Sequence, residues 1–241
     1  VRFRVTQPGL LARARPLLAV DDVSFKLAVG ETLGVVGESG CGKSSLARAV
    51  LQLIPEASGR VCLLGRELAQ LEGIELKNMR RDMQVIFQDP QASLDPRMTI
   101  SQIVGESLDT FHSDLDQAER HECVVSALLR VGLGAEHLNR YPHEFSGGQA
   151  QRIGIARALV FDPQLLVCDE PVSALDVSIQ AQIINLLMGL QAERGLSLIF
   201  IAHDLAVVRH ISHRVMVMYL GRAVEIADRQ SLYGRPRHPY T

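Results

Sequence analysis

The chain has 241 residues and a formal net charge of −2, with 47% hydrophobic and 22% charged residues. This composition is typical of a globular protein and excludes intrinsic disorder and collagen-like repeats. The near-neutral charge provides no global basic field, so we expect no nucleic-acid partner. No apolar run approaches the ~20 residues that a membrane-spanning helix needs. The four scattered cysteines show neither metal-ligand spacing nor a disulfide framework.

The first part of the chain alternates between expected strands and helices. Ala19–Val29 alternates imperfectly between apolar and polar residues, and Thr32–Val36 is a short apolar run that is followed by a Gly-rich segment. A helix is expected over Ser45–Leu53, where Pro55 ends it. Further strands are expected at Arg60–Leu64 and Met83–Phe87. A strand, a glycine turn and a helix in this order predict the opening of an α/β unit.

The character of the chain changes from Asp89 onward, where apolar residues take helical spacing. Helices are expected over Ile100–Leu108, Gln117–Val131 and Gln149–Val160. We therefore predict that residues 89–159 form an α-helical lobe inserted into the α/β core.

The α/β core is expected to resume after this lobe. Continuous apolar runs that are separated by helices indicate a mainly parallel sheet with both faces covered. The predicted fold is thus α/β, with residues 1–88 and 160–220 forming the core of a single domain, 1–241. The expected strands are Gln164–Cys168, Ser197–Ala202, Arg214–Met218 and Ala223–Ile226, and the expected helices are Ile179–Glu193 and Leu205–Ile211.

The segment Gly37–Ser44 reads GESGCGKS and matches the phosphate-loop pattern G-x-x-x-x-G-K-[ST]. Its glycines allow several backbone N–H groups to face one anion, and the helix that follows adds its positive N-terminal end. Lys43 is expected to reach the β- and γ-phosphates, the Ser44 hydroxyl to ligate Mg²⁺, and Ser45 to add a hydroxyl contact. The alternative is a Gly-rich turn without a ligand. The predicted nucleotide-binding residues are Gly37, Glu38, Ser39, Gly40, Cys41, Gly42, Lys43, Ser44 and Ser45.

Two acidic residues, Asp169 and Glu170, follow the expected strand Gln164–Cys168. Ligands of parallel α/β sheets bind at the carboxyl ends of the strands. Asp169 is therefore expected to hold Mg²⁺. Glu170 points elsewhere, because successive strand residues alternate between faces, and it is expected to be the general base for a water that attacks the γ-phosphate. The alternative is a polar strand end without a catalytic role.

Two further polar residues follow expected strands of the same sheet. His203 comes after Ser197–Ala202 and is expected to contact the γ-phosphate. Gln88 comes after Met83–Phe87 and is expected to sense Mg²⁺ or the attacking water. Taken alone, a histidine is more often structural, and a loop glutamine carries little information.

A second glycine motif, Ser146-Gly147-Gly148-Gln149, opens an expected helix. Ser146 and Gln149 have the spacing of a capping box, so one interpretation is a well-capped helix. However, two glycines that expose backbone N–H groups at a helix start also form an anion site. One phosphate loop has little use for a second phosphate site in its own chain. In a dimer, this motif could instead close over the nucleotide of the other chain.

The ordered motifs GESGCGKS, FQDP, FSGGQ, LLVCDE, SALD and AHD together resemble the ATP-binding cassette (ABC) family, from about residue 17 to the end. The resemblance implies a P-loop NTPase (RecA-like) fold with an antiparallel β part and an inserted helical lobe. It also implies that two cassettes sandwich two ATP molecules head to tail. Ser146, Gly147 and Gly148 would then bind the γ-phosphate of the partner's ATP, and the SALD segment, residues 173–176, would bridge the two sites.

Longer segments resemble one subfamily, the ATP-binding subunits of bacterial di- and oligopeptide importers. These segments are DPRMTI, RYPHEFSGGQ, SALDVSIQAQ, LSLIFIAHDLAVV and the tail HPYT. The resemblance implies ATP hydrolysis that powers peptide import from the cytoplasmic face of the inner membrane. The implied partners are a second ABC ATPase subunit, two membrane permeases and, indirectly, an extracytoplasmic peptide-binding protein. Import of nickel or glutathione, and a non-transport ABC ATPase, are the alternatives.

The chain departs from the family pattern at a few positions. Its signature motif opens with Phe145 rather than the more usual leucine. ABC cassettes usually stack an aromatic side chain on adenine, but Gly9–Arg13 contains none, and Phe3 is the nearby aromatic candidate. Subfamily members continue beyond HPYT, so residues 221–241 are expected to begin a C-terminal extension.

Overall fold

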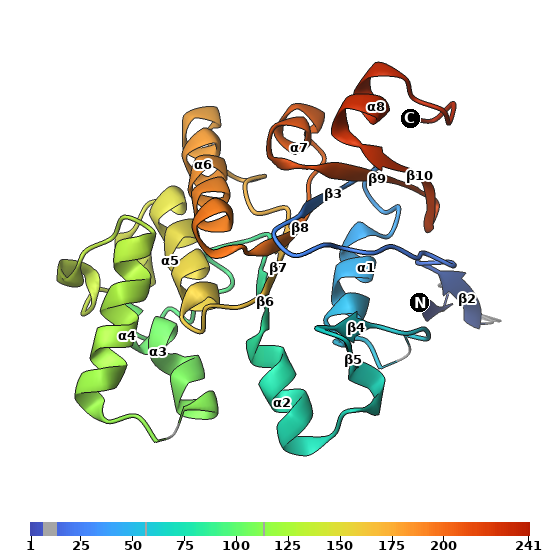
Figure 1. Cartoon of the computed structure of the whole chain (residues 1–241). Helices are drawn as coiled ribbons and strands as arrows, with labels where there is room; N and C mark the ends of the chain where they lie inside the picture. The colour runs from blue at the N-terminus through green and yellow to red at the C-terminus, as the bar shows by residue number, and fades with distance from the viewer. Residues whose placement is uncertain (7–13, 56, 113) are drawn as a thin grey trace.

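The computed structural model describes residues 1–6, 14–55, 57–112 and 114–241. A six-stranded sheet with the order β10-β9-β3-β8-β7-β6 runs through the molecule (Figure 1). Neighbouring strands are parallel except for β10, which pairs antiparallel with β9. The predicted mainly parallel α/β sheet is therefore confirmed. The strands are β3 (Thr32–Val36), β6 (Met83–Ile86), β7 (Leu165–Asp169), β8 (Ser197–Ile201), β9 (Arg214–Tyr219) and β10 (Arg222–Asp228).

The central strands are apolar along their whole length because both faces of the sheet are covered. Every residue of β3, β7 and β8 is buried. Along β7, Leu166 and Cys168 join one hydrophobic cluster, whereas Leu165 and Val167 join a second cluster. This separation follows from the two-residue period of a strand, which sends neighbouring side chains to opposite faces.

Helices cover the two faces of the sheet unequally. Buried side chains of α1 and α2 belong to one cluster, and those of α5, α6 and α7 belong to the other. No helix in the described parts of the chain is both long and apolar enough to cross a membrane. The helices are α1 (Lys43–Val50), α2 (Gly73–Arg81), α3 (Ile100–Phe111), α4 (Gln117–Arg130), α5 (Gly147–Leu159), α6 (Val177–Arg194), α7 (Leu205–Ile211) and α8 (Arg229–Gly234).

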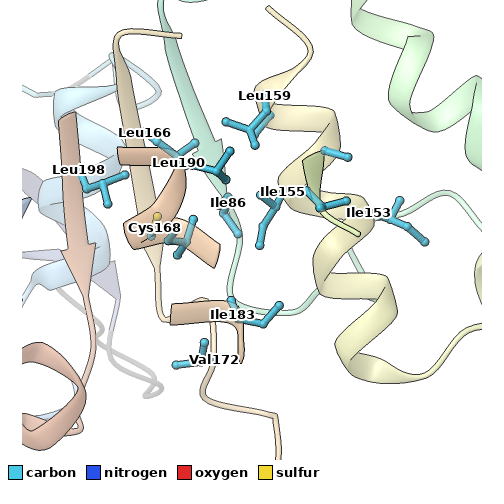
Figure 2. Packing of buried hydrophobic residues seen from close by; sticks show 14 of the residues in the cluster. Ile86, Ile153, Ile155, Leu159, Leu166, Cys168, Val172, Ile183, Leu190 and Leu198 are labelled. Atoms are coloured by element: carbon cyan, nitrogen blue, oxygen red, sulfur yellow. The ribbon is translucent and has the colours of Figure 1, made fainter. Parts of the chain in front are cut away.

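Helices α3, α4 and α5 pack against one another, and α3 and α4 lie at the end of the molecule away from β2 (Figure 1). Figure 2 shows Ile155 and Leu159 on the side of α5 that faces the sheet, with Ile155 next to Ile86 of β6. One buried cluster thus continues from the helices into the sheet. The division into a core, a lobe over 89–159 and an extension over 221–241 stays a prediction.

Two segments with strand-like patterns differ from the structure. Ala19–Val29 is not a strand: its alternate side chains are half-buried, but the segment makes no ladder hydrogen bonds. Its carbonyl groups accept side-chain hydrogen bonds instead, from Arg214 to Lys26 and from Ser197 to Ala28. The strand expected over residues 60–64 shrinks to β4 (Cys62–Leu63), which pairs with β5 (Arg66–Glu67).

The family resemblance implied an antiparallel β part, but some individual elements were not located from the sequence. An antiparallel pair joins β1 (Arg2–Thr6) to β2 (Ala14–Leu18), and α2 and α8 are additional helices. Helix α2 buries only Met79 among its nine residues, so few core side chains marked it in the sequence. Helix α8 similarly buries only Leu232.

Candidate nucleotide-binding and catalytic site

The predicted site residues follow the parallel strands at one edge of the sheet. The phosphate loop begins at Gly37, directly after β3, and Asp169 is the last residue of β7. Gln88 and His203 follow shortly after β6 and β8, respectively. Because these four strands are parallel, their carboxyl ends meet at the same edge, as expected for ligand sites in open α/β sheets.

Backbone crowding imposes the glycines of the phosphate loop. Gly37 and Gly42 have positive φ angles of 154° and 106°, and Gly40 has a φ of 81°. A Cβ on Gly37 would lie 2.2 Å from the carbonyl oxygen of Met218, and one on Gly42 would lie 2.1 Å from that of Ala19. Both the conformation and the lack of space therefore require glycine at these two positions.

Lys43 is the first residue of α1 and is only 5% exposed. Its ammonium donates hydrogen bonds to the carbonyl oxygens of Gly37 (2.7 Å) and Glu38 (3.0 Å). The positive charge thus sits within the curl of the loop, next to the N-terminus of a helix. This arrangement concentrates donors and positive potential where a phosphate would bind.

Other predicted residues of the loop differ in burial. The N–H of Cys41 donates to the carbonyl oxygen of Glu38 (3.2 Å), and the carbonyl oxygen of Cys41 accepts from the N–H of Gly221 (2.9 Å). Cys41 is buried, so it acts as a small packing residue of the loop. Ser39 is exposed, and Ser45 is half-buried in the first turn of α1.

Ser44 and Asp169 form the predicted metal-binding pair. The Ser44 hydroxyl donates to the Asp169 carboxylate at 2.9 Å, although the two residues are 125 positions apart. Burial raises the pKa of Asp169, and the hydrogen bond from Ser44 opposes this rise. No cluster of three or more metal-binding side chains occurs among the described residues. Two adjacent hard oxygen donors nevertheless fit Mg²⁺, which typically binds one or two protein oxygens together with phosphates and water.

Glu170 lies between Gln88 and His203, so the structure brings three of the four predicted catalytic residues together, and Lys43 is the fourth. The Gln88 amide donates to Glu170 Oε2 at 3.0 Å, and His203 Nδ1 lies 3.6 Å from the same oxygen. Glu170 has a left-handed φ of 49°, and its N–H donates to the carbonyl oxygen of Ile201. This turn directs the Glu170 carboxylate to a different set of partners from those of Asp169.

The second glycine motif forms the N-terminus of α5. Ser146 is the N-cap, and its side chain and that of Gln149 complete a capping box. The glycines pack against the start of α6, where a Cβ on Gly148 would lie 2.5 Å from Ile179. In the described structure, no hydrogen bond or ion pair joins this motif to the phosphate loop. Helices α1 and α5 lie on opposite faces of the sheet.

Some residues near the site were missed or left open at the level of sequence. The hydroxyl of Tyr240, in the HPYT tail, accepts the N–H of Glu38 at 3.1 Å. The tail was noticeable as a motif, but nothing in its composition indicated this contact. Gly9–Arg13 lies outside the described residues. Phe3 lies on β1 and packs against the same hydrophobic cluster as α1.

Comparisons with known proteins identify the family of this chain. The family profile described as ABC transporter matches residues 20–173. The oligopeptide transport ATP-binding protein OppF of Escherichia coli is 60% identical over 227 residues, which cover 94% of this chain and 68% of OppF. The glutathione import ATP-binding protein GsiA of Pectobacterium atrosepticum is 55% identical over 241 residues, which cover 100% of this chain and 38% of GsiA.

A solved structure shows the same fold. It is the dimeric, post-hydrolysis state of the ATP-binding cassette MJ0796 bound to ADP and Pi, which is 28% identical with a TM-score of 0.78. The match covers 94% of this chain and 97% of that one. This chain belongs to the ABC transporter family.

Proposed function

We propose that this chain is the ATP-hydrolysing subunit of a bacterial importer of oligopeptides. It would work at the cytoplasmic face of the membrane, paired with a second ABC ATPase subunit and bound to two permeases. An extracytoplasmic peptide-binding protein would deliver the peptide. The observation that carries this proposal is the 60% identity to OppF over 94% of the chain.

Glu170 is the proposed general base. Its carboxylate accepts a proton from the attacking water, while the water oxygen bonds to the γ-phosphorus and the bond to the β–γ bridging oxygen breaks. Gln88 and His203 orient the water and the γ-phosphate, which is supported by their positions beside Glu170 Oε2. Lys43 stabilises the negative charge that is spread over the β- and γ-phosphates.

Ser44, Asp169 and Gln88 are the proposed holders of Mg²⁺, which neutralises phosphate charge when it is bound. Ser44 and Asp169 already present neighbouring oxygens. The Gln88 amide nitrogen donates a hydrogen bond to Glu170, so the side-chain oxygen of Gln88 is the atom left to bind the metal. One residue would thereby connect the metal site with the catalytic base.

The complete site is proposed to need two cassettes, arranged head to tail. Ser146, Gly147, Gly148 and Gln149 of one chain would contact the γ-phosphate bound to the phosphate loop of the other. The Ser173 hydroxyl donates to the carbonyl oxygen of Glu170 at 3.1 Å, so the SALD segment is linked to the turn that holds Glu170. ATP would close the pair, hydrolysis would open it, and the loop around Gln88 with the helical lobe would transmit the motion to the permeases.

The catalytic assignment is tested by Glu170→Gln, which keeps the shape of the side chain but removes the base. We expect the rate of ATP hydrolysis to fall by about 10²- to 10⁴-fold, with ATP binding retained. Glu193→Gln, the same change at an exposed position of α6, is the matched control and should leave the rate unchanged. A wild-type hydrolysis rate in Glu170→Gln would refute the assignment.

The transport assignment is tested in Escherichia coli cells that lack OppF and receive this chain instead. We expect uptake of a radiolabelled tripeptide with the wild-type chain and none with Glu170→Gln. Uptake of glutathione or nickel without peptide uptake would show that the transported solute is that compound and not a peptide. A chain that restores no uptake and co-purifies with no permease would contradict an importer role.

A further inference from the structure

The tail His238–Thr241 takes no part in the proposed mechanism, yet specific hydrogen bonds hold it. The Glu225 carboxylate of β10 accepts the backbone N–H groups of Arg237 (2.9 Å) and His238 (3.0 Å). The hydrogen bond from the Arg237 N–H lowers the pKa of Glu225 below its ordinary value, and the bond from the His238 N–H adds a smaller lowering. The N–H of Tyr240 then donates to His238 Nδ1 at 3.2 Å. The tail is therefore a turn that is anchored to the sheet.

This turn places Tyr240 beside the phosphate loop. The ring of Tyr240 packs on that of Tyr219, the last residue of β9, with 4.4 Å between ring centroids and an interplanar angle of 39°. Tyr240 also packs against the larger hydrophobic cluster. Its hydroxyl accepts the N–H of Glu38, which lies 202 positions earlier in the chain.

The contact acts on a peptide group that also holds Lys43. The carbonyl of Gly37 and the N–H of Glu38 belong to one planar peptide unit, so they point in opposite directions. The carbonyl oxygen accepts from the Lys43 ammonium at 2.7 Å, while the N–H donates to Tyr240. Glycine permits many combinations of φ and ψ, so hydrogen bonds help to fix the orientation of the peptide that follows Gly37.

We infer that Tyr240 is a positioning residue of the phosphate loop, whose hydroxyl fixes the Gly37–Glu38 peptide so that its carbonyl holds the Lys43 ammonium in place. This inference rests on the proposed ATPase function. Lys43 is expected to contact phosphate both before and during hydrolysis. Loss of the hydroxyl should therefore weaken nucleotide binding more than it slows the chemical step.

Tyr240→Phe is the test, because it removes the hydroxyl and keeps the ring. We expect the KM for ATP and the Kd of a non-hydrolysable ATP analogue to rise by about twofold to tenfold, the range for one neutral hydrogen bond. The kcat should stay within about twofold. Tyr233→Phe is the matched control: it removes a tyrosine hydroxyl that donates to Leu205 at 2.7 Å, in the same C-terminal region. It should leave KM and Kd unchanged.

Glu225→Ala is a second variant, which releases the anchor of the turn and should raise KM in the same way. Unchanged KM and Kd in Tyr240→Phe, with or without a lower melting temperature, would overturn the inference. Tighter ATP binding would also overturn it, since the hydroxyl would then compete with the nucleotide for the Glu38 N–H. Failure of the wild-type chain to bind ATP would refute the proposed function itself, and is thus distinguishable.

Discussion

Asp169 shows a conflict between stability and function at the scale of one residue. It is a carboxylate with only 8% exposure at the end of a buried strand. Burial disfavours its charged form and raises its pKa, and the Ser44 hydrogen bond only opposes this effect. A buried anionic oxygen is nevertheless what the proposed metal site requires.

We predict that Asp169→Asn raises the free energy of unfolding of the nucleotide-free protein at pH 7. A carboxyl whose pKa is raised on folding contributes most to stability below its unfolded value, near 3.8, and this contribution is lost as pH rises through the folded pKa. Asparagine keeps an acceptor for Ser44 but carries no charge. Urea unfolding at pH 7 and at pH 4 measures the change, which should shrink at the lower pH.

The same variant should lower Mg²⁺-dependent ATP hydrolysis by about 100-fold or more, since a metal ligand contributes several kcal/mol to the transition state. A lower free energy of unfolding at pH 7 would contradict the argument from burial. Unchanged hydrolysis would instead contradict the metal role. The two measurements therefore test separate claims about one side chain.

At the scale of elements, the N-terminus of α5 combines a structural and a proposed functional role. Ser146 and Gln149 form a capping box, which alone accounts for these residue types. Helix α4 begins with an equivalent capping box, formed by Asp116 and Glu119. The two helices thus provide a matched pair in which only α5 carries the glycines of the signature motif.

We predict that Ser146→Ala and Asp116→Ala each lower the free energy of unfolding by about 1 kcal/mol, the usual contribution of an N-cap. Only Ser146→Ala should also lower ATP hydrolysis, because its hydroxyl is proposed to contact the partner's γ-phosphate. Chemical denaturation and steady-state ATPase rates provide the comparison. An equal loss of ATP hydrolysis in both variants would show that Ser146 acts only as a helix cap.

For the whole molecule, the important feature is that α1 and α5 cover opposite faces of the sheet. The phosphate loop and the signature motif are consequently kept apart within one chain. In the proposed arrangement, each chain holds two half-sites, and a complete site needs a second cassette. The solved cassette MJ0796 is a dimer in its post-hydrolysis state with ADP and Pi.

We predict that ATP with Mg²⁺ converts Glu170→Gln from a monomer of 26.5 kDa to a dimer of about twice that mass. ATP that is bound but not hydrolysed would bridge the two chains and hold them together. Light scattering with and without ATP measures the mass, and Lys43→Ala in the same background should stay monomeric. Suppose that the variant binds ATP but its measured mass does not increase, either alone or mixed with a second ABC ATPase subunit. This result would contradict the head-to-tail arrangement.

Features that depend on neighbouring residues could be predicted from the sequence. The phosphate loop is one continuous segment, and its pattern identified both the turn and the helix after it. The meeting of Gln88, Glu170 and His203 was also predictable, because each follows a strand of a parallel sheet. The strands themselves were recognisable from their continuous apolar runs, which a sheet covered on both faces requires.

Other features depended on the tertiary structure. The alternation in Ala19–Val29 is typical of a strand, but half-burial produces the same pattern without ladder hydrogen bonds. The left-handed turn at Glu170 and the contact of Tyr240 with Glu38 were equally hidden. The sequence by itself thus determined which residues carry the proposed chemistry, because motif residues are contiguous or follow strands. Only the packing of the sheet decided which helix covers which face and where the tail docks, because these depend on contacts between residues far apart in the chain.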